Sequence, residues 1–453
     1  MPAEEKAVYD VVVTGGGASG LIAAGRAGEL GARVLLLEKT DSLGKKIMIS
    51  GKNRCNLTNA AELQDFIAMY GVNGRFLYNA FHHFFRPELL SLLQSYGLIT
   101  KVERGGRIFP ASDDARDVVK SLGKYLAASN VKIHVNTKVT AIRKKDDSLF
   151  EVQTSKVNFR TKAIIVATGG ATWPSTGSGG DGYKISADLG HNIVKLKPAL
   201  VPLIVQEIDA AKAMQGVSLR NIRATAFQGE AGRIDATLTP QIDYGRGEKK
   251  SPPVPLIESR FGEMLFTHFG LGGPVILLMS LAVVQALEKG PVSILLDLKP
   301  ALSREQLRLR LQKDFDNSGK KKIKSLMKEY LPGKMVESFV TLTGIDSEKQ
   351  AHQITACEKE QIIELLKAMR FNVKSALPLA KAIVTAGGVS LTEIDPRTMA
   401  SRLIPGLYFC GEVMDIDADT GGYNLQAAFS TGYVAGESAA KYTTKLPSGV
   451  LYP

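Results

Sequence analysis

The chain has 453 residues, of which 44% are hydrophobic and 23% are charged, and these values indicate a globular protein of two or three domains. Its three cysteines, Cys55, Cys357 and Cys410, are odd in number and far apart, which excludes a disulfide framework and favours a reducing compartment. The longest apolar run, 275–287, is shorter than the roughly twenty residues of a bilayer span. No targeting segment is recognisable, so we expect a cytoplasmic protein without integral membrane association.

The formal net charge of +12 includes lysine runs at 249–250 and 320–324. Such runs can form a nucleic-acid or anionic-membrane surface, or simply the solvated faces of helices and loops. No aromatic residues alternate with these lysines, which favours the second interpretation. We therefore expect no nucleic-acid partner, although some of the charge could serve an anionic cofactor.

Residues 11–39 have the order strand, glycine turn, helix, strand and acid, which is a dinucleotide-binding fingerprint. Gly15 allows a sharp turn, Gly17 lets the backbone approach a pyrophosphate, and Gly20 lets the helix pack closely on the sheet. The helix that starts near Ala18 offers free N–H groups to phosphates. Glu38, at the end of the second strand, can accept hydrogen bonds from a ribose, which favours NAD or FAD over NADP. The strand before the glycine turn, and the helix, strand and acid after it, argue against an ordinary turn without a ligand.

The stretch 44–59 is polar, broken by glycines and rich in cations and amides, so we expect a loop rather than a helix. A loop after the ribose-binding strand would lie along the cofactor, where its lysines, Arg54 and backbone N–H groups suit phosphate and flavin oxygens. The alternative is a surface loop with scattered charge.

Helical spacing follows at 76–96, with Pro87 in a first turn, and at 113–128, with Ser112 as the cap. His82 and His83 lack further ligands nearby and are interpreted as packing or surface residues, so no metal site is expected. Short strands are predicted at 132–135, 138–143, 150–154 and 162–166.

The last of these strands runs into Ala167-Thr168-Gly169-Gly170, where glycines permit close approach of the main chain to a ligand. The turn-rich stretch 171–183 contains Gly177, Gly179 and Gly182 at GxGxxG spacing, but it does not follow a strand directly. We therefore reject a second nucleotide fold there and expect a helix from Asp181.

The pattern then divides the chain. We predict a first part of an FAD-binding domain at 1–195, a β-barrel-like insertion at 196–300 that contains a buried helix at 275–287, a helical subdomain at 301–372, and a second part of the FAD-binding domain at 373–453. In that last part, Gly411 ends a strand and Asp415 is our choice for the ribityl hydroxyls. Gly421, Gly422 and Asn424 open a helix whose dipole would face the flavin pyrimidine. An α/β end without a ligand is the alternative for this tail.

With these residues in hand, the chain resembles the BaiN-type family of FAD-binding proteins, also described as aminoacetone-oxidase-like NAD(P)/FAD-dependent oxidoreductases. The resemblance rests on Gly15–Gly20 with Glu38, on Ser50-Gly51 with 54–59, and on the motifs at 176–183, 265–268, 384–389, 411–412 and 421–426. It implies an α/β fold: a split Rossmann-like FAD-binding domain of glutathione-reductase type with an inserted β-barrel-like and helical region. Lys52-Asn53 and Gly272 depart from the family pattern on what would be the substrate face. Family members include reductases of steroid-like enones and amine oxidases, so neither substrate is carried over.

In flavoproteins of this plan, the Ala-Thr-Gly-Gly strand end passes beneath the cofactor, and Val139, on a strand just before it, lies where the adenine edge meets backbone groups. The complete set of predicted cofactor-binding residues is Gly15, Gly16, Gly17, Ala18, Ser19, Gly20, Glu38, Lys39, Lys45, Lys46, Gly51, Arg54, Cys55, Asn56, Val139, Thr168, Gly169, Gly170, Gly411, Asp415, Gly421, Gly422, Asn424 and Leu425.

These residues predict an FAD-dependent oxidoreductase that transfers hydride between flavin N5 and an unidentified small organic substrate, with NADH or NADPH as a transient donor. A disulfide reductase is disfavoured because it needs two close cysteines and Cys55 is alone. The catalytic group stays open: Tyr183, His268 and Tyr423 are candidates, although each is more readily interpreted as structural. The alternative function is a flavin-binding, redox-sensing protein that contacts RNA or protein and turns over little. The oligomeric state stays open.

Overall fold

The computed structural model describes residues 8–145, 149–234 and 256–443. The chain forms two compact units. Unit 1 comprises Met1–Lys197 and Ile383–Pro453, and unit 2 comprises Pro198–Ala382. Unit 1 is thus built from two distant stretches of the sequence, and unit 2 is inserted between them.

Unit 1 is built on a seven-stranded sheet with the order β6-β2-β1-β9-β8-β7, in which β18 also pairs with β9. The strands that run parallel to one another are β1 (Val8–Thr14), β2 (Val34–Leu37), β6 (Lys132–His134), β9 (Phe159–Val166) and β18 (Leu407–Phe409). β7 (Val139–Lys144) and β8 (Phe150–Thr154) are antiparallel to them. Val11, Val12 and Val13 have no exposed surface, as expected for a central parallel strand that is covered on both faces.

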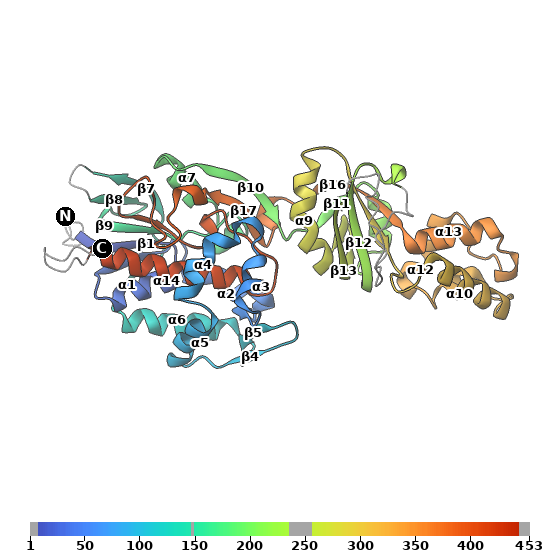
Figure 1. The fold of residues 1–453 in the computed structure, drawn as a ribbon, viewed down its shortest axis with the longest axis horizontal. Helices are drawn as coiled ribbons and strands as arrows, with labels where there is room; N and C mark the ends of the chain where they lie inside the picture. The colour runs from blue at the N-terminus through green and yellow to red at the C-terminus, as the bar shows by residue number, and fades with distance from the viewer. Residues whose placement is uncertain (1–7, 146–148, 235–255, 444–453) are drawn as a thin grey trace. The chain divides into compact units, whose positions relative to one another are not determined.

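Helices α1 (Ala18–Glu29) and α14 (Tyr423–Thr443) lie side by side against this sheet (Figure 1). Their backbones approach closely because α14 presents glycines to α1. A Cβ atom at Gly432 would lie 2.3 Å from the Ser19 carbonyl oxygen, and one at Gly436 would lie 2.3 Å from that of Ala23. The two sequence halves of unit 1 are therefore joined through a helix pair that tolerates no side chain at these positions.

The remaining elements of unit 1 surround this framework. A three-stranded sheet has the order β3-β5-β4, and a two-stranded sheet pairs β10 with β17. The bounds are α2 (Lys45–Asn53), β3 (Thr58–Asn59), α3 (Leu63–Ala68), α4 (Tyr78–His83), α5 (Arg86–Ser95), β4 (Thr100–Val102), β5 (Arg107–Pro110), α6 (Ala115–Ala128), η3 (Pro174–Thr176), α7 (Asp181–Asp188), β10 (Ile193–Ala199), β17 (Val384–Val389) and η9 (Gly411–Val413).

Two local predictions in unit 1 were wrong. The stretch from Lys45 to Asn53 is the helix α2 rather than a loop, although Ser50 to Lys52 have non-helical backbone angles. Its Ile47 side chain is buried, and α2 packs on α6, so tertiary contact stabilises a helix that its polar composition disfavours. The cap of α6 is Asp114, whose carboxylate accepts a hydrogen bond from the Arg116 N–H at 2.8 Å, and not Ser112.

Unit 2 is a closed barrel with the strand order β11-β14-β13-β12-β15-β16. Its strands are β11 (Leu203–Val205), β12 (Ser218–Gln228), β13 (Leu256–Thr267), β14 (Gly270–Gly272), β15 (Val292–Asp297) and β16 (Met369–Ala376). The apolar helix α9 (Pro274–Leu287) packs against β13. A barrel closes on itself and leaves no unpaired edge strand.

A group of helices in unit 2 follows β15 and precedes β16, so this group is itself an insertion into the barrel. They are α10 (Arg304–Asn317), α11 (Ile323–Met327), α12 (Gly333–Thr343) and α13 (Ala356–Lys367), while α8 (Ile208–Ala213) follows β11. α10, α12 and α13 gather at one end of the barrel (Figure 1). The predicted fold class, a split Rossmann-like α/β domain with an inserted barrel and helices, is confirmed.

Candidate cofactor-binding site

The candidate site lies at the carboxyl edge of the parallel strands of unit 1. Thr14, at the end of β1, is in register with Val166, at the end of β9, and Val166 is in register with Phe409, at the end of β18. The loops that follow these three strands therefore begin side by side. In open α/β sheets, ligands bind in the crevice outside this edge.

The glycine turn after β1 has the geometry that the sequence predicted. Gly15 has a φ of +104°, and a Cβ atom there would lie 2.4 Å from the Ala167 carbonyl oxygen. A Cβ atom at Gly20 would lie 1.9 Å from the Gly15 carbonyl oxygen, whereas one at Gly17 would meet nothing within 4 Å. Gly17 is the N-cap of α1, and no side chain caps this helix. The first N–H groups of α1 thus face open space, which suits an anion.

Glu38 lies next to this turn and is buried. Its carboxylate accepts hydrogen bonds from the backbone N–H groups of Gly16, at 2.8 Å, and of Thr40, at 2.7 Å. A carboxylate has about four lone-pair positions, so two remain for hydroxyl donors. The carbonyl oxygen of Glu38 also accepts from the Thr137 N–H at 2.8 Å, which places Val139, the start of β7, near the same acid.

The second half of unit 1 reaches the same turn. Ser19 Oγ donates to the Cys410 carbonyl oxygen at 3.4 Å. A Cβ atom at Gly411 would lie 2.5 Å from Ser19 Oγ. The structure therefore brings the predicted residues 15–20 and Gly411 together, although almost 400 residues separate them in the sequence (391 between Ser19 and Cys410).

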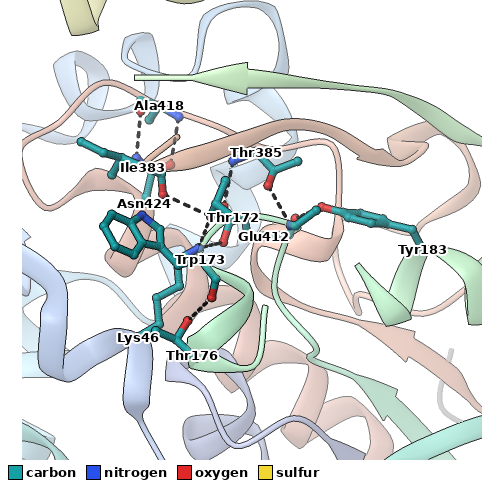
Figure 2. A network of polar contacts seen from close by, with 11 residues as sticks. Lys46, Thr172, Trp173, Thr176, Tyr183, Ile383, Thr385, Glu412, Ala418 and Asn424 are labelled. Atoms are coloured by element: carbon teal, nitrogen blue, oxygen red, sulfur yellow. Dashed lines mark hydrogen bonds and ion pairs between the residues drawn. The ribbon is translucent and has the colours of Figure 1, made fainter. Parts of the chain in front are cut away.

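A polar network connects the loops after β9 and β18 with α2 and β17 (Figure 2). Lys46 Nζ lies 2.6 Å from Glu412 Oε2 and donates to Thr172 Oγ1 at 2.8 Å. Glu412 Oε1 accepts the Thr385 N–H at 2.9 Å. Thr385 Oγ1 accepts the Ala171 N–H at 2.9 Å. The predicted residue Lys46 thus takes part in holding four chain segments together at this edge.

Sequence reasoning did not select three members of this network, Thr172, Thr385 and Glu412, as site residues. Signals for two of them existed, because Glu412 directly follows Gly411 and Thr385 lies within the apolar, glycine-containing motif at 384–389. Nothing in the sequence indicates that Thr172 receives a hydrogen bond from Lys46, which is 126 residues away.

Thr168, Gly169 and Gly170 follow β9 directly and pack beneath α7 and the network. A Cβ atom at Gly170 would lie 2.4 Å from Thr385 Oγ1, and one at Gly182, in α7, would lie 1.9 Å from Thr168 Oγ1. Threonine side chains packed against the backbone at Gly170 and Gly182 therefore leave no room for a Cβ atom at either position.

A third group of predicted residues meets at the start of α14. Asn59 Nδ2 donates to the Gly421 carbonyl oxygen at 3.0 Å. Gly422 has a φ of +100°, and a Cβ atom there would lie 2.4 Å from the Thr58 carbonyl oxygen. The segment that contains Asn56 is therefore joined to the N-terminus of α14 by backbone contacts that a side chain at Gly422 would break.

Asn424 and Leu425 belong to the first turn of α14. The Asn424 amide is already bonded: Nδ2 donates to the Ala418 carbonyl oxygen at 2.8 Å, and Oδ1 accepts the Ala418 N–H at 3.0 Å. Its side chain therefore fixes the loop before the helix.

The other predicted cations form ion pairs within the protein. Lys39 pairs with Asp181, Lys45 pairs with Asp41 at 2.6 Å, and Arg54 pairs with Asp113 at 2.6 Å and with Glu103. The Arg54 guanidinium also stacks over the Phe109 ring. Burial alone would raise the pKa of Asp181, but Lys39 and Lys138 hold it below its usual range. Together with Lys46, these make four predicted cations that are held by acidic partners within the protein.

Gly51 lies in the non-helical part of α2, and Cys55 lies just beyond the end of this helix. The Cys55 thiol is fully buried, and burial raises its pKa to about 12. Burial likewise raises the pKa of Cys410 to about 12. Both thiols stay protonated near neutral pH and are poor nucleophiles. A Cβ atom at Gly51 would lie 2.9 Å from the Asn56 N atom, so this glycine allows a tight turn.

An acidic loop, Asp415 to Asp419, connects η9 with α14. Burial raises the pKa of Asp415, and its carbonyl oxygen accepts Asn73 Nδ2 at 2.8 Å. Burial and the negative charges of Asp415, Asp419 and Glu412 raise the pKa of Asp417 to about 6. The sequence analysis did not select Asp417, since a pKa shift depends on burial that no local pattern reveals.

The three catalytic candidates have different surroundings. Tyr183 is buried, and its hydroxyl donates to the Glu412 carbonyl oxygen at 3.0 Å. Burial raises the pKa of Tyr183, so this phenol stays protonated. The Tyr423 ring packs edge-on against Phe66, with ring centroids 4.6 Å apart. His268 belongs to unit 2, on the turn between β13 and β14, and its ring contacts Phe269. The structure therefore brings Tyr183, but not Tyr423, into the polar network.

Three buried polar atoms at this edge show how well the site fits FAD. Asn56 Oδ1, Thr58 Oγ1 and Thr168 Oγ1 have no hydrogen-bond partner. Buried polar atoms in proteins are nearly always paired, so orphaned atoms need an explanation such as an ion or a ligand. Together with the open space at Gly17 and the uncapped α1, they fit a bound dinucleotide that carries phosphates, hydroxyls and ring heteroatoms.

Comparison with known proteins matches residues 9–438 to the HI0933-like protein Rossmann domain family. The chain belongs to this family. A relative that is 31% identical, over 95% of this chain and 98% of its own length, is the 3-dehydro-bile acid delta(4,6)-reductase of Clostridium scindens. Another, 27% identical over 95% of this chain and 97% of its own length, is the ribosomal RNA dihydrouridine synthase of Escherichia coli.

Among solved structures, the chain is similar to the open conformation of a flavocytochrome c3 fumarate reductase. It is 16% identical, the match covers 98% of this chain and 80% of that chain, and the TM-score is 0.44. The predicted resemblance to the BaiN-type flavoprotein oxidoreductases is confirmed by the family match and the full-length relatives. In the described part of the chain, no helix has both the length and the apolar character needed to cross a membrane.

Proposed function

We propose that this protein is an FAD-dependent reductase of a carbon–carbon double bond that is conjugated to a carbonyl group in a small organic molecule. The observation that carries the proposal is the full-length similarity to relatives whose names describe this one type of reaction. A delta(4,6)-reductase of a 3-dehydro compound saturates double bonds conjugated to a ketone, and a dihydrouridine synthase saturates the double bond next to a uracil carbonyl.

The FAD would be held at the carboxyl edge of unit 1. The N-terminus of α1, with Gly15 to Gly20, would bind the pyrophosphate, and Glu38 would accept hydrogen bonds from the ribose. Val139 would lie at the adenine, and Lys39, Lys45, Lys46 and Arg54 would contribute positive charge. The other predicted residues would line the flavin and its ribityl chain, namely Gly51, Cys55, Asn56, Thr168, Gly169, Gly170, Gly411, Asp415, Gly421, Gly422, Asn424 and Leu425. When bound, FAD supplies a hydride at flavin N5.

The chain's own groups would orient the reaction and stabilise its charges. The uncapped α1 would place positive partial charge near the phosphates, and the N-terminus of α14 would face the flavin pyrimidine. The ion pair between Lys46 and Glu412, which is tied to Thr172 and Thr385, fixes the loops at this edge. NADH or NADPH would be the transient electron donor.

An anaerobic experiment tests this proposal. The purified protein is loaded with FAD, its visible spectrum is recorded, and the flavin is reduced with NADH or NADPH, or with dithionite if neither acts. Cyclohexenone is then added, with cyclohexanone as the control that lacks the double bond. We expect cyclohexenone to reoxidise the flavin and to be recovered as cyclohexanone. A reduced flavin that is reoxidised by air but by no conjugated alkene would overturn the proposal.

A second candidate substrate is a uridine base within RNA. It is favoured by the relative named as a ribosomal RNA dihydrouridine synthase and by the net charge of +12. The ion pairs of the basic run weaken the case for an RNA-binding surface. Lys321 pairs with Glu329, and Lys322 and Lys324 pair with Glu348. Lys249 and Lys250 lie outside the described residues.

Uridine monophosphate and a uridine-containing ribosomal RNA fragment, offered to the reduced protein, decide between these substrates. Reoxidation by the RNA fragment, with a steep dependence on salt, would assign the RNA substrate. A flavin that ignores both nicotinamides and all alkenes, in a protein that nevertheless shifts an RNA probe, would indicate the redox-sensing alternative.

A further inference from the structure

The loop after β9 carries Trp173, the one tryptophan of the chain. Its backbone has φ +54° and ψ +63°, which is the left-handed region. A bulky residue in this region is an outlier. Such a strained backbone costs free energy, so it persists only where the surrounding structure holds it, and it occurs most often at ligand sites.

The surrounding structure does hold this residue. The Trp173 carbonyl oxygen accepts hydrogen bonds from the Thr176 N–H, at 2.9 Å, and from Thr176 Oγ1, at 2.8 Å. The preceding residue, Thr172, is fully buried and receives a hydrogen bond from Lys46. The position of Trp173 is therefore fixed from both sides by polar contacts at the carboxyl edge.

The indole ring does not use this position to pack in the core. Trp173 is 40% exposed, and Figure 2 shows its indole beside the network with no hydrogen bond drawn to the ring. Thr172 Oγ1 also lies within 3.4 Å of the Ile383 carbonyl oxygen, and the Ile383 side chain is 41% exposed. Two large apolar side chains thus remain half-exposed next to the polar network. An exposed aromatic ring gains the most free energy of burial when it contacts another flat apolar surface.

We infer that Trp173 is a substrate-binding residue whose indole stacks on a planar ring that carries the conjugated double bond and carbonyl group. The inference rests on the proposed function, since it names what holds that substrate. The ring could belong to an enone or to a uracil base, because both present a π-face. Stacking is tolerant of such differences, whereas hydrogen bonds would not be.

The sole tryptophan provides a test that does not depend on turnover. The FAD-loaded, oxidised protein is excited selectively at Trp173, and quenching by acrylamide is measured with and without cyclohexenone or uridine monophosphate. We expect at least one probe to protect Trp173 from acrylamide. If neither probe protects it, the inference is overturned, whatever the flavin does with alkenes.

A double variant, Trp173→Phe with Tyr442→Trp, moves the tryptophan to a matched control position. Tyr442 is also 40% exposed, but it lies beside Gly406, at the opposite end of β9 and β18. We expect no protection by either probe there. Equal protection at both positions would show non-specific association and would overturn the inference.

A kinetic test uses reoxidation of the reduced flavin by whichever probe reacts. Trp173→Ala should raise the KM for that probe by about tenfold or more, and Trp173→Phe should change it much less. kcat should stay nearly constant, since the indole does not donate the hydride or a proton. A fall in kcat with an unchanged KM would contradict stacking. The visible FAD spectrum and the Tm of each variant identify any loss of folding. If no alkene reacts at all, the proposed function fails, and acrylamide protection still decides the role of Trp173.

Discussion

Unit 2 buries a charged pair whose groups are fully bonded, whereas unit 1 buries hydroxyl and amide atoms that have no partner. Lys367 Nζ donates to Asp297 Oδ2 at 2.6 Å and to the carbonyl oxygens of Lys299 and Leu302, at 3.1 and 2.7 Å. Among the described residues, the unpartnered buried atoms of unit 1 belong to Asn56, Thr58, Thr168, His191 and Gln426, and Arg370 contributes the one in unit 2. A fully bonded charge maintains structure. Orphaned atoms at a sheet edge leave room for a ligand.

Within unit 1, the glycines around the candidate site fall into two kinds. Gly15, Gly20, Gly170 and Gly422 contact backbone or polar atoms so closely that a Cβ atom would clash, while Gly17 faces open space. These distances therefore separate the glycines that the fold requires from Gly17, at which the fold itself leaves room for a side chain. The predictions below test both contrasts.

The largest expected effect is on the buried pair of unit 2. Lys367→Met leaves the Asp297 carboxylate buried without its ammonium partner, which typically costs about 3–5 kcal/mol. The free energy of unfolding from urea denaturation measures this loss. The matched control is Lys322→Met, which removes an exposed ion pair with Glu348 and should cost about 0–1 kcal/mol. Equal losses in both variants would mean that burial does not distinguish the two pairs.

The next effect separates the two kinds of glycine in unit 1. Gly20→Ala places a methyl group against the Gly15 carbonyl oxygen and should cost about 1–3 kcal/mol of stability. Gly17→Ala should leave the stability of the FAD-free protein within about 0.5 kcal/mol but weaken FAD binding, since its methyl group enters the space expected for the phosphates. Urea denaturation and FAD titration measure the two effects. Normal FAD affinity in Gly17→Ala would place the phosphates elsewhere.

Glu38→Gln tests the ribose contact. A neutral amide has one acceptor oxygen and no charge, and hydrogen bonds to charged groups contribute about 1.5–3 kcal/mol. We expect FAD affinity to fall by about tenfold or more, measured by titration of the FAD-free protein. Glu437→Gln, which alters an ion pair with Arg26 on the α1–α14 pair, is the control and should bind FAD normally. An unchanged affinity in Glu38→Gln would remove Glu38 from the site.

The last expected effect concerns the pH dependence of stability. The pKa of Asp417 is raised from 3.8 to about 6 in the folded protein. A raised pKa in an acid means that the folded state holds the proton more tightly than the unfolded state. Stability therefore falls as the pH rises between these two values and stays lower above them.

Asp417→Asn should remove this loss of stability at high pH, because an amide does not ionise. We expect its Tm to exceed that of the unsubstituted protein at pH 8, by about 2–4 °C for each kcal/mol recovered. At a pH below 3.8, the two proteins should have similar Tm values. A Tm difference that is independent of pH would contradict a titrating Asp417.

Several features of the fold follow from local sequence. The turn 15–20 requires glycine at fixed positions, and the strands β1 and β2 on either side are continuous apolar runs, so both could be predicted without the tertiary structure. The barrel was predicted as a β-barrel-like insertion at 196–300, without the strand β16 that closes it. β16 spans the predicted domain boundary at 372/373. Its partner strand β15 lies 70 or more residues earlier in the sequence, so the sequence around β16 does not show that it belongs to the barrel.

The α2 helix shows the opposite case. Its sequence is polar and contains two glycine breaks nearby, so propensity favours a loop. Burial of Ile47 and packing on α6 nevertheless stabilise a helix here. Tertiary contacts routinely override weak local preferences, since burying one aliphatic side chain contributes about 1.5–3 kcal/mol.

The sequence by itself determined the nucleotide-binding turn, its acid, the two-part Rossmann-like domain and the family, because these depend on residue types at short, fixed spacing. Only the tertiary structure decided which charges pair and which polar atoms remain unpartnered. Lys46 and Glu412 are 366 residues apart, and the exposure of Trp173 depends on how the loop after β9 is held. Such properties arise from burial and long-range contact, which no segment of the chain specifies alone.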